Sequence, residues 1–322
     1  MRLLVVGGTS FNGRALVETA LAQGHDVTLF NRGQTNSDLF PGVERRHGDR
    51  QTSDLKSLAD GEWDAAVDVS GYQPRHVKEM ATLLADRVGY YCFISTGAVY
   101  EPLADHIDED AALKHLADPA DETFNLETYG PLKVLCEQEV EAVFGGRASH
   151  IRLGIAVGPH DMTDRFTYWV RRLTRDGRVL GPPRADQPIQ LIAATDEAAF
   201  VLGLVNSRTP GVFNVVGDPV TFEAMIDACA VVAGTSADVT WAPEDVLTKE
   251  NVALPLALPA SGGLDQMYRI ANDRAKAAGL VVTPLADVAA ATLGWDRTRE
   301  QSAALSVGPA ADAERAVLGK LM

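Results

Sequence analysis

Tyr129 and Lys133 are the pair of side chains whose chemistry is easiest to specify from residue type and spacing. They lie four residues apart within a predicted helix, and residues at this spacing share one helix face. A phenol exchanges a proton with an alcohol near neutral pH when its pKa falls below the usual value of about 10. Because a neighbouring ammonium lowers that pKa, the pair predicts proton transfer to or from the oxygen of an alcohol.

A segment with two hydroxyls supports this interpretation. Residues 90–95 are typical of a buried strand, and Ser95 and Thr96 lie at its carboxyl end. In open α/β sheets, ligands bind at the carboxyl ends of the strands. Thr96 or Ser95 is therefore a candidate to polarise a carbonyl oxygen beside Tyr129.

A glycine-rich turn lies between the first predicted strand and the first predicted helix, at residues 7–13. Its glycines suit a G-x-x-G-x-x-G pattern in which serine occupies the middle position. Such a turn needs glycine where φ is positive and where the backbone approaches a pyrophosphate, and the helix N-terminus supplies N–H groups. The alternative is a purely structural turn. Its place at the first strand–helix junction favours a dinucleotide site made by Gly7, Thr9, Ser10, Phe11, Asn12 and Gly13.

The end of the second predicted strand bears on the choice of cofactor. An acidic residue there favours NAD, whereas a basic residue accommodates the 2′-phosphate of NADP. The chain has Asn31 and Arg32 at this place, so NADP is modestly favoured over NAD. Asn31 can still bond a ribose hydroxyl, and the alternative for Arg32 is a solvated loop charge. Asp49, after the third strand, is expected to meet the adenine amino group or to cap its loop.

Strands and helices alternate along the first half of the chain. This alternation, with short loops, predicts an α/β fold of the Rossmann type with a doubly wound parallel sheet. The predicted strands cover residues 3–6, 26–30, 43–47, 63–69, 90–95 and 149–157, and the main helices cover 14–23, 75–86 and 128–144.

Beyond residue 158 the alternation loosens, which indicates a smaller, mostly C-terminal α/β substrate domain. The expected dinucleotide-binding domain comprises residues 1–158 and 186–217, and the substrate domain comprises 159–185 and 218–322. Residues 189–193 are expected to return to the main sheet. The acidic segment 105–110 is interpreted as a solvated loop, with a lid as the alternative.

Charge and composition exclude several classes of protein. The net charge of −15, from 44 acidic and 29 basic side chains, opposes binding to a phosphate backbone, so no nucleic-acid partner is expected. The three cysteines form no C-x-x-C pair and the seven histidines lack ligand spacing, so no metal is expected. No apolar run is long enough to span a membrane, and no signal peptide is seen, so cytoplasm is the expected location.

Several motifs together carry a resemblance to a known family. In chain order they are the glycine turn, Ser95-Thr96, Tyr129 with Lys133, Gly158-Pro159 and Thr195-Asp196. By these motifs the chain resembles an extended short-chain dehydrogenase/reductase of the NAD-dependent epimerase/dehydratase group, over nearly its whole length. The resemblance implies that Tyr129 is the acid/base, Lys133 the cofactor anchor and Thr96 the hydroxyl partner. It also implies that Ser70 and Gly71 line the cofactor.

Departures from the family pattern indicate an atypical branch. Ser10 replaces the middle glycine and Asn31 replaces the usual ribose-binding aspartate. The G-G-T-x-F-x-G-R opening is similar to a branch that contains chloroplast stem-loop RNA-binding relatives.

Other departures concern the substrate. Gly97 and Ala98 occupy the positions where sugar dehydratases of this group have Asp-Glu, so dehydration is not expected. Ile155 and Ile189 replace residues that contact the diphosphate in nucleotide-sugar enzymes, which argues against such a substrate.

These observations predict an NAD(P)-dependent reductase or epimerase that transfers hydride at a secondary alcohol or ketone. The expected partner is a sugar-like or natural-product small molecule, and a homodimer is implied by the resemblance only. The alternative is a non-catalytic NAD(P)-binding regulator or an RNA-binding relative. The aromatic cluster of residues 166–169 is expected to be packing. Candidates for substrate contact are Tyr72, Gly97, His160 and Arg165.

Overall fold

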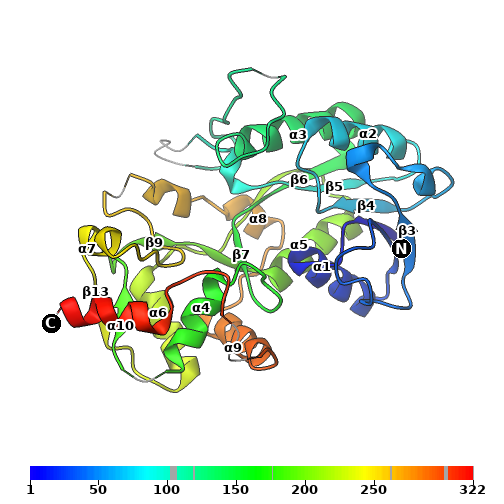
Figure 1. Ribbon diagram of the computed structural model, residues 1–322. Helices are drawn as coiled ribbons and strands as arrows, with labels where there is room; N and C mark the ends of the chain where they lie inside the picture. Colours follow the sequence, from blue (N-terminus) through cyan, green and yellow to red (C-terminus); the bar gives the residue numbers. More distant parts are fainter. Residues whose placement is uncertain (102–106, 119, 176, 262, 301–303, 322) are drawn as a thin grey trace. The chain divides into compact units, whose positions relative to one another are not determined.

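The computed structural model describes residues 1–101, 107–118, 120–175, 177–261, 263–300 and 304–321. The chain forms two compact units (Figure 1). The first comprises Met1–Ala156, Ala194–Val216 and Ile270–Val281, and the second comprises Val157–Ala193, Gly217–Arg269 and Val282–Met322. These bounds differ from the expected ones at 186–193 and at 270–281. The assignment of cofactor and substrate to separate domains stays a prediction.

A seven-stranded parallel sheet forms the centre of the first unit, in the order β11-β6-β5-β4-β1-β2-β3. The predicted Rossmann-type fold is therefore confirmed. The strand order reverses between β1 and β4, which creates a crevice at the carboxyl ends of these strands. The strands are β1 (Arg2–Val6), β2 (Asp26–Asn31), β3 (Glu44–His47), β4 (Ala65–Asp68), β5 (Tyr91–Ile94), β6 (Ala148–Leu153) and β11 (Gly211–Val215).

Two pairs of helices cover the sheet. Helices α1 (Phe11–Ala22) and α5 (Ala194–Ser207) pack together on one face, and α2 (Pro74–Leu84) and α3 (Tyr129–Phe144) pack together on the other (Figure 1). Apolar side chains of α2 recur at helical spacing and join the core between the α2–α3 pair and the sheet. The shorter helices of this unit are η1 (Arg50–Thr52), η2 (Lys56–Leu58), η3 (Gly97–Val99), η4 (Gly145–Arg147) and α8 (Asp273–Ala277).

The second unit contains three helices that pack on one another, α4 (Arg165–Leu173), α6 (Phe222–Ala233) and α9 (Leu285–Asp296). Phe166, Tyr168 and Trp169 of α4 are buried, which confirms that this aromatic cluster is packing. Strand β8 (Val179–Gly181) pairs with β13 (Val239–Trp241), and β9 (Pro188–Ile189) pairs with β12 (Val220–Thr221). The remaining elements are β7 (Ile155–Val157), which crosses the unit boundary, β10 (Leu191–Ala193), α7 (Glu244–Lys249), η5 (Asp265–Tyr268) and α10 (Ala311–Lys320).

The expectation that residues 189–193 return to the main sheet is wrong. Strand β11, which follows α5 directly, takes the place beside β6. Ile189 lies instead in the two-residue strand β9. That strand begins at Pro188, whose missing N–H suits a short edge strand rather than a sheet interior.

The solvated-loop interpretation of residues 105–110 holds for Asp110, which is exposed, but is wrong for Ile107 and Glu109. Residues 105 and 106 lie outside the described part of the chain. Ile107 is only 2% exposed and Glu109 only 7% exposed. The Glu109 carboxylate accepts a hydrogen bond from the Asn214 backbone N–H at 2.9 Å, so Ile107 and Glu109 belong to the packed interior of the first unit.

The buried carboxyl of Glu197, in α5, should make the stability of the fold depend on pH. Its carboxyl is buried, and its Oε2 atom has no hydrogen-bond partner among the described residues. Burial raises the pKa of Glu197 from 4.5 to about 8. The folded protein therefore holds a proton that the unfolded chain has already released, so stability is lost as pH rises through this window.

We expect the free energy of unfolding of the wild type to fall by a few kcal/mol relative to Glu197→Gln between about pH 5 and about pH 9. Urea-induced unfolding at several pH values measures this difference. The matched control is Glu62→Gln, which changes an exposed carboxylate and should follow the wild type. A constant difference between Glu197→Gln and wild type across the pH range would contradict the prediction.

Candidate active site

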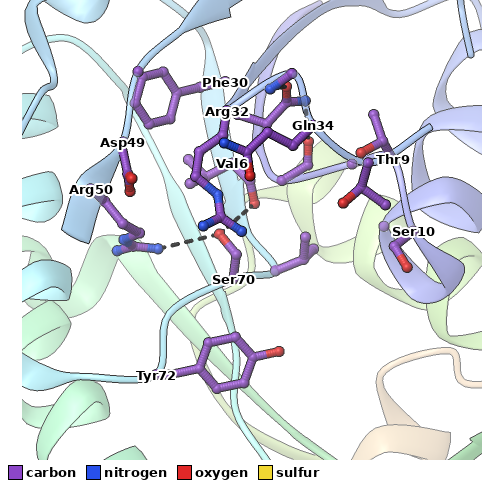
Figure 2. Close-up of a pocket in the computed structure, with 18 of the residues that line it drawn as sticks. Val6, Thr9, Ser10, Phe30, Arg32, Gln34, Asp49, Arg50, Ser70 and Tyr72 are labelled. Carbon is purple, nitrogen blue, oxygen red and sulfur yellow. Dashed lines mark hydrogen bonds between the residues drawn. The ribbon is translucent and has the colours of Figure 1, made fainter. Parts of the chain in front are cut away.

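A cavity of about 420 Å³ opens at the carboxyl ends of the central strands in the first unit. Its walls come from the glycine turn, the end of β2, residues 48–51 after β3, and Val69, Ser70 and Tyr72 after β4. Figure 2 shows Thr9 and Ser10 on one side of this cavity and Asp49 and Arg50 on the other. The predicted site residues that it brings together are Gly7, Thr9, Ser10, Phe11, Asn12, Gly13, Asn31, Arg32, Asp49, Ser70 and Tyr72.

The glycine turn is packed so closely that side chains are excluded at two places. Gly8 has a φ of +94°, and a Cβ there would lie 2.7 Å from the Leu29 side chain. A Cβ on Gly13 would lie 3.0 Å from the Gly8 backbone. Helix α1 follows at once and has no acidic residue in its first turn, so the positive end of its dipole is not neutralised there. The turn therefore has the properties of a phosphate cradle.

Two asparagine amides hold the glycine turn in place. Asn31 donates from Nδ2 to the Gly7 carbonyl at 3.0 Å and accepts from the Gly33 N–H at 2.9 Å. Asn36 donates from Nδ2 to the Thr9 carbonyl at 2.8 Å. A carboxylate cannot donate to a carbonyl, so an aspartate at position 31 would lose the first of these bonds. The predicted contact of Asn31 with a ribose hydroxyl stays a prediction, and sequence reasoning missed Asn36.

Arg50 lines the cavity and was also missed. Its Nη1 donates to both carboxylate oxygens of Asp68, at 2.8 and 3.0 Å, and lies 3.4 Å from Ser70 Oγ (Figure 2). Tyr91 donates to the same carboxylate at 2.9 Å. Burial opposes ionisation of Asp68, but Arg50 outweighs it and holds the pKa of Asp68 below its usual value. The only local signal for this pair is an acidic residue inside an otherwise apolar strand.

Asp49 acts as a cap in this structure. Its Oδ1 accepts a hydrogen bond from the Gln51 N–H at 2.9 Å, at the start of η1. The side chain also faces the cavity (Figure 2). The cap is thus shown, and the predicted contact with adenine stays a prediction.

The buried amine of Lys133 joins the ends of two strands. Its Nζ donates to the Ile94 carbonyl at 2.6 Å and to the Gly71 carbonyl at 2.8 Å. The amine also lies 4.2 Å from the centre of the Phe93 ring. Burial lowers the pKa of Lys133 from 10.5 to about 8. Because Ile94 lines the cavity, the amine lies directly behind part of the cavity wall.

Tyr129 is the first residue of α3, one helical turn before Lys133. Burial raises the pKa of the Tyr129 phenol, although a hydrogen bond with the Thr96 side chain acts in the opposite direction. The expectation that Lys133 depresses the pKa of this phenol below its usual value therefore differs from the structure. The physical reason is that desolvation of the phenol dominates, while the amine is engaged by two carbonyl groups.

An aromatic contact path connects the phenol with the cavity. The Tyr72 ring lines the cavity and contacts the Phe124 ring edge-on, with 5.8 Å between centroids. Phe124 contacts the Tyr129 ring in the same way at 5.9 Å. Sequence reasoning missed Phe124.

The other predicted residues do not line this cavity. Gly71, Thr96 and Gly97 lie at the strand ends just described, with Tyr129 and Lys133 on α3. His160 and Arg165 belong to the second unit, where the His160 ring lies 5.3 Å from the Trp295 ring. Their contact with a substrate stays a prediction. Across the described residues, no cluster of three or more His, Cys, Asp or Glu could hold a metal, and no helix is long and apolar enough to cross a membrane.

Solved structures of other proteins share this fold. A putative epimerase from Burkholderia cenocepacia J2315 matches with a TM-score of 0.69 at 18% identity, over 92% of this chain and 98% of that one. The Bordetella bronchiseptica enzyme WbmH, in complex with NAD+, matches with a TM-score of 0.66 at 16% identity, over 92% and 98%. The UDP-glucose 4-epimerase of Thermus thermophilus, in complex with NAD, matches with 0.65 at 18% identity, over 92% and 99%.

These structures confirm, at the level of the fold, the predicted resemblance to the extended short-chain dehydrogenases/reductases. Among curated proteins, the chain is similar to the chloroplast stem-loop binding protein of 41 kDa b from Arabidopsis thaliana, with 26% identity over 254 residues. The match covers 72% of this chain and 63% of that protein, so the chain spans less than two thirds of that relative. No family model matches the chain.

The packing of the glycine turn generates a test with a matched control. Gly13 and Gly203 are both helical, so replacement by alanine improves helix propensity by a similar amount at each. A Cβ meets the Gly8 backbone at position 13 but nothing within 4 Å at position 203. We expect Gly13→Ala to lower the melting temperature and to weaken NADPH binding roughly tenfold or more. Gly203→Ala should keep NADPH affinity and should keep or raise the melting temperature, and equal behaviour of the two variants would contradict a close-packed cradle.

Proposed function

We propose that this chain is an NAD(P)-dependent reductase or epimerase that acts at a secondary alcohol or ketone carbon of a sugar-like or natural-product small molecule. The observation that carries the proposal is the grouping of Tyr129, Thr96 and Lys133 at the strand ends that border a glycine-lined cavity. The likeness in fold to WbmH and to the Thermus epimerase, both solved with NAD, adds support.

The residues of the cavity fit a dinucleotide. The side-chain-free backbone at Gly8 and Gly13, together with the N-terminus of α1, would hold the pyrophosphate. Asp49 and Ser70 would meet the adenosine end and the central part of the molecule. A bound nicotinamide supplies or accepts the hydride in this class of reaction. No metal is proposed.

Arg32 supports the preference for NADP. Within the described part of the chain, no ion pair is recorded for Arg32, which lines the cavity and is exposed. Arg50 also lines the cavity, but its charge is compensated by the bidentate contact with Asp68. Of the two arginines that line the cavity, Arg32 is therefore the one available to a 2′-phosphate.

In this proposal, residues of the chain transfer a proton to or from the substrate and position the substrate oxygen. Tyr129 would give its phenolic proton to, or take it from, the substrate oxygen, with the Thr96 hydroxyl as a second hydrogen-bond partner of that oxygen. Lys133 would hold the two strand ends beside the phenol through the carbonyls of Ile94 and Gly71. Gly97 and Ala98 provide no carboxyl group, so elimination of water is not part of the proposal.

A second candidate function is non-catalytic RNA binding or regulation, favoured by the likeness to the chloroplast stem-loop binding protein. The net charge of −15 opposes contact with a phosphate backbone. A homodimer formed through α3 remains a prediction from the resemblance alone.

Tyr129→Phe separates the two candidates. The change removes the proton donor without altering the cavity wall, so NADPH affinity should stay within about twofold of wild type. Turnover of ketones should fall about a hundredfold or more, because general acid–base catalysis contributes at least that much. Isothermal titration with NADPH and a spectrophotometric assay over a ketone panel provide the two measurements.

The matched controls for this experiment are Thr96→Ser, which keeps the hydroxyl, and Thr96→Val, which removes it. Only the second should reduce turnover. A wild-type protein that binds NADPH, reduces no ketone and oxidises no alcohol would sink the enzymatic proposal, and stem-loop RNA binding by that protein would favour the alternative.

Arg32→Ala tests the choice of cofactor. Loss of a charge-assisted hydrogen bond to a phosphate should weaken NADPH binding by roughly tenfold to a hundredfold. NADH lacks that phosphate, so its dissociation constant should change by less than about threefold. Arg75→Ala removes an equal charge at a site that does not line the cavity, and it should affect neither cofactor. Equal losses for NADPH and NADH in Arg32→Ala would discard the assignment.

A further inference from the structure

Three side chains of helix α3 each hydrogen-bond with a residue at the end of β5. Tyr129, Lys133 and Glu137 recur every four residues and so share one helix face. Tyr129 hydrogen-bonds with Thr96, and Lys133 donates to the Ile94 carbonyl at 2.6 Å. Glu137 accepts from the Ser95 hydroxyl at 2.5 Å. Three consecutive residues of the strand end therefore each have one partner on the helix.

The third contact is held by a buried ion pair. Arg152 of β6 donates to the Glu137 carboxylate from Nη2 at 2.9 Å and from Nε at 3.2 Å. Glu137 is 6% exposed and Arg152 is 4% exposed. Ionised groups at such depth are retained only with close partners, because each charge loses its hydration. Both carboxylate oxygens of Glu137 have a guanidinium partner, so the carboxylate is fixed in place.

Two further hydrogen bonds fix the guanidinium of Arg152. Its Nη1 donates to the Tyr100 hydroxyl at 3.0 Å and to the Glu109 carbonyl at 2.9 Å. Tyr100 in turn donates to Asn214 Oδ1 of β11 at 2.6 Å. The network thus extends from α3 across β6 to β11, and none of its members lines the dinucleotide cavity.

We propose that Glu137 is a positioning residue for the proton-transfer pair, holding the strand end that carries Thr96 and the Ile94 carbonyl against Tyr129 and Lys133. The inference rests on the function proposed above. Its first support is geometric, since Ser95 lies between the two strand-end residues that contact the pair. Its second support is electrostatic. Burial lowers the pKa of Lys133 and Arg50 adds to this lowering, whereas Cys136, Asp68 and Glu137 oppose it.

A purely structural ion pair is the competing interpretation, and the state of Lys133 distinguishes the two. The chain has seven lysines, so protein labelled with ¹³C at lysine Cε gives a spectrum in which each signal can be followed with pH. In the wild type, one signal should titrate at about pH 8. Its absence from Lys133→Arg assigns it.

Glu137→Gln keeps the shape of the side chain and removes the charge. The Lys133 signal should then titrate at a lower pH than in the wild type, because the ammonium loses a stabilising charge. The matched control is Glu141→Gln, one turn further along α3, where the carboxylate is 59% exposed. In this control the midpoint should stay at its wild-type value. An unchanged midpoint in Glu137→Gln, or an equal shift in both variants, overturns the electrostatic part of the proposal.

Ser95→Ala tests the geometric part separately, because it removes the contact with the strand end and keeps the Glu137–Arg152 pair. We expect the Lys133 midpoint to stay unchanged and kcat to fall roughly tenfold, with NADPH affinity unchanged. Unchanged kcat overturns the geometric part. If Glu137→Gln does not fold by circular dichroism, Glu137→Asp replaces it, and a wild-type midpoint with wild-type kcat in that variant overturns the proposal.

The two proposals fail in different ways. A wild type without turnover on any carbonyl substrate removes the proposed function, whereas the Lys133 titration needs no substrate and still decides whether Glu137 acts on the amine. A wild type with turnover and a titration insensitive to Glu137→Gln removes only the positioning role.

Discussion

The burial of the Lys133 amine is the constraint on which the site depends. An ammonium removed from water needs oxygen acceptors, and here they are the carbonyls of Ile94 and Gly71 at the ends of two neighbouring strands. The Lys133 ammonium, on α3, thereby holds the ends of β4 and β5 close to this helix at the wall of the cavity. The phenol of Tyr129 then follows from helix geometry, because it lies one turn away on the same face.

Two buried ion pairs occur near this amine, one from each neighbouring part of the sheet. Arg50 with Asp68 lies at the end of β4, and Arg152 with Glu137 lies between β6 and α3. Such pairs add little net stability, because desolvation offsets much of their attraction. These pairs instead fix the geometry, because a planar guanidinium donates well to a carboxylate only over a narrow range of orientations. The strand ends around the cavity are thus held by directional contacts in addition to apolar packing.

The local parts of this arrangement could be predicted from the sequence, and the long-range parts could not. Apolar runs identified the central strands, and the spacing of Tyr129 and Lys133 identified their shared helix face. The pairing of Ser95 with Glu137 joins residues far apart in the chain, so no local pattern reveals it. For the same reason β11 was missed in favour of residues 189–193, which are equally apolar. The direction in which the pKa of Tyr129 shifts depends on the burial of its phenol, which only the packed structure determines.

The asparagine amides that hold the glycine turn restrict which side chains position 31 can carry. An aspartate at position 31, as in the family pattern, would replace the amide that donates to Gly7. That single change would set a carboxylate against a carbonyl oxygen. A chain with aspartate at position 31 would therefore need another donor to support the turn, so residue 31 cannot be exchanged independently of the loop that it holds.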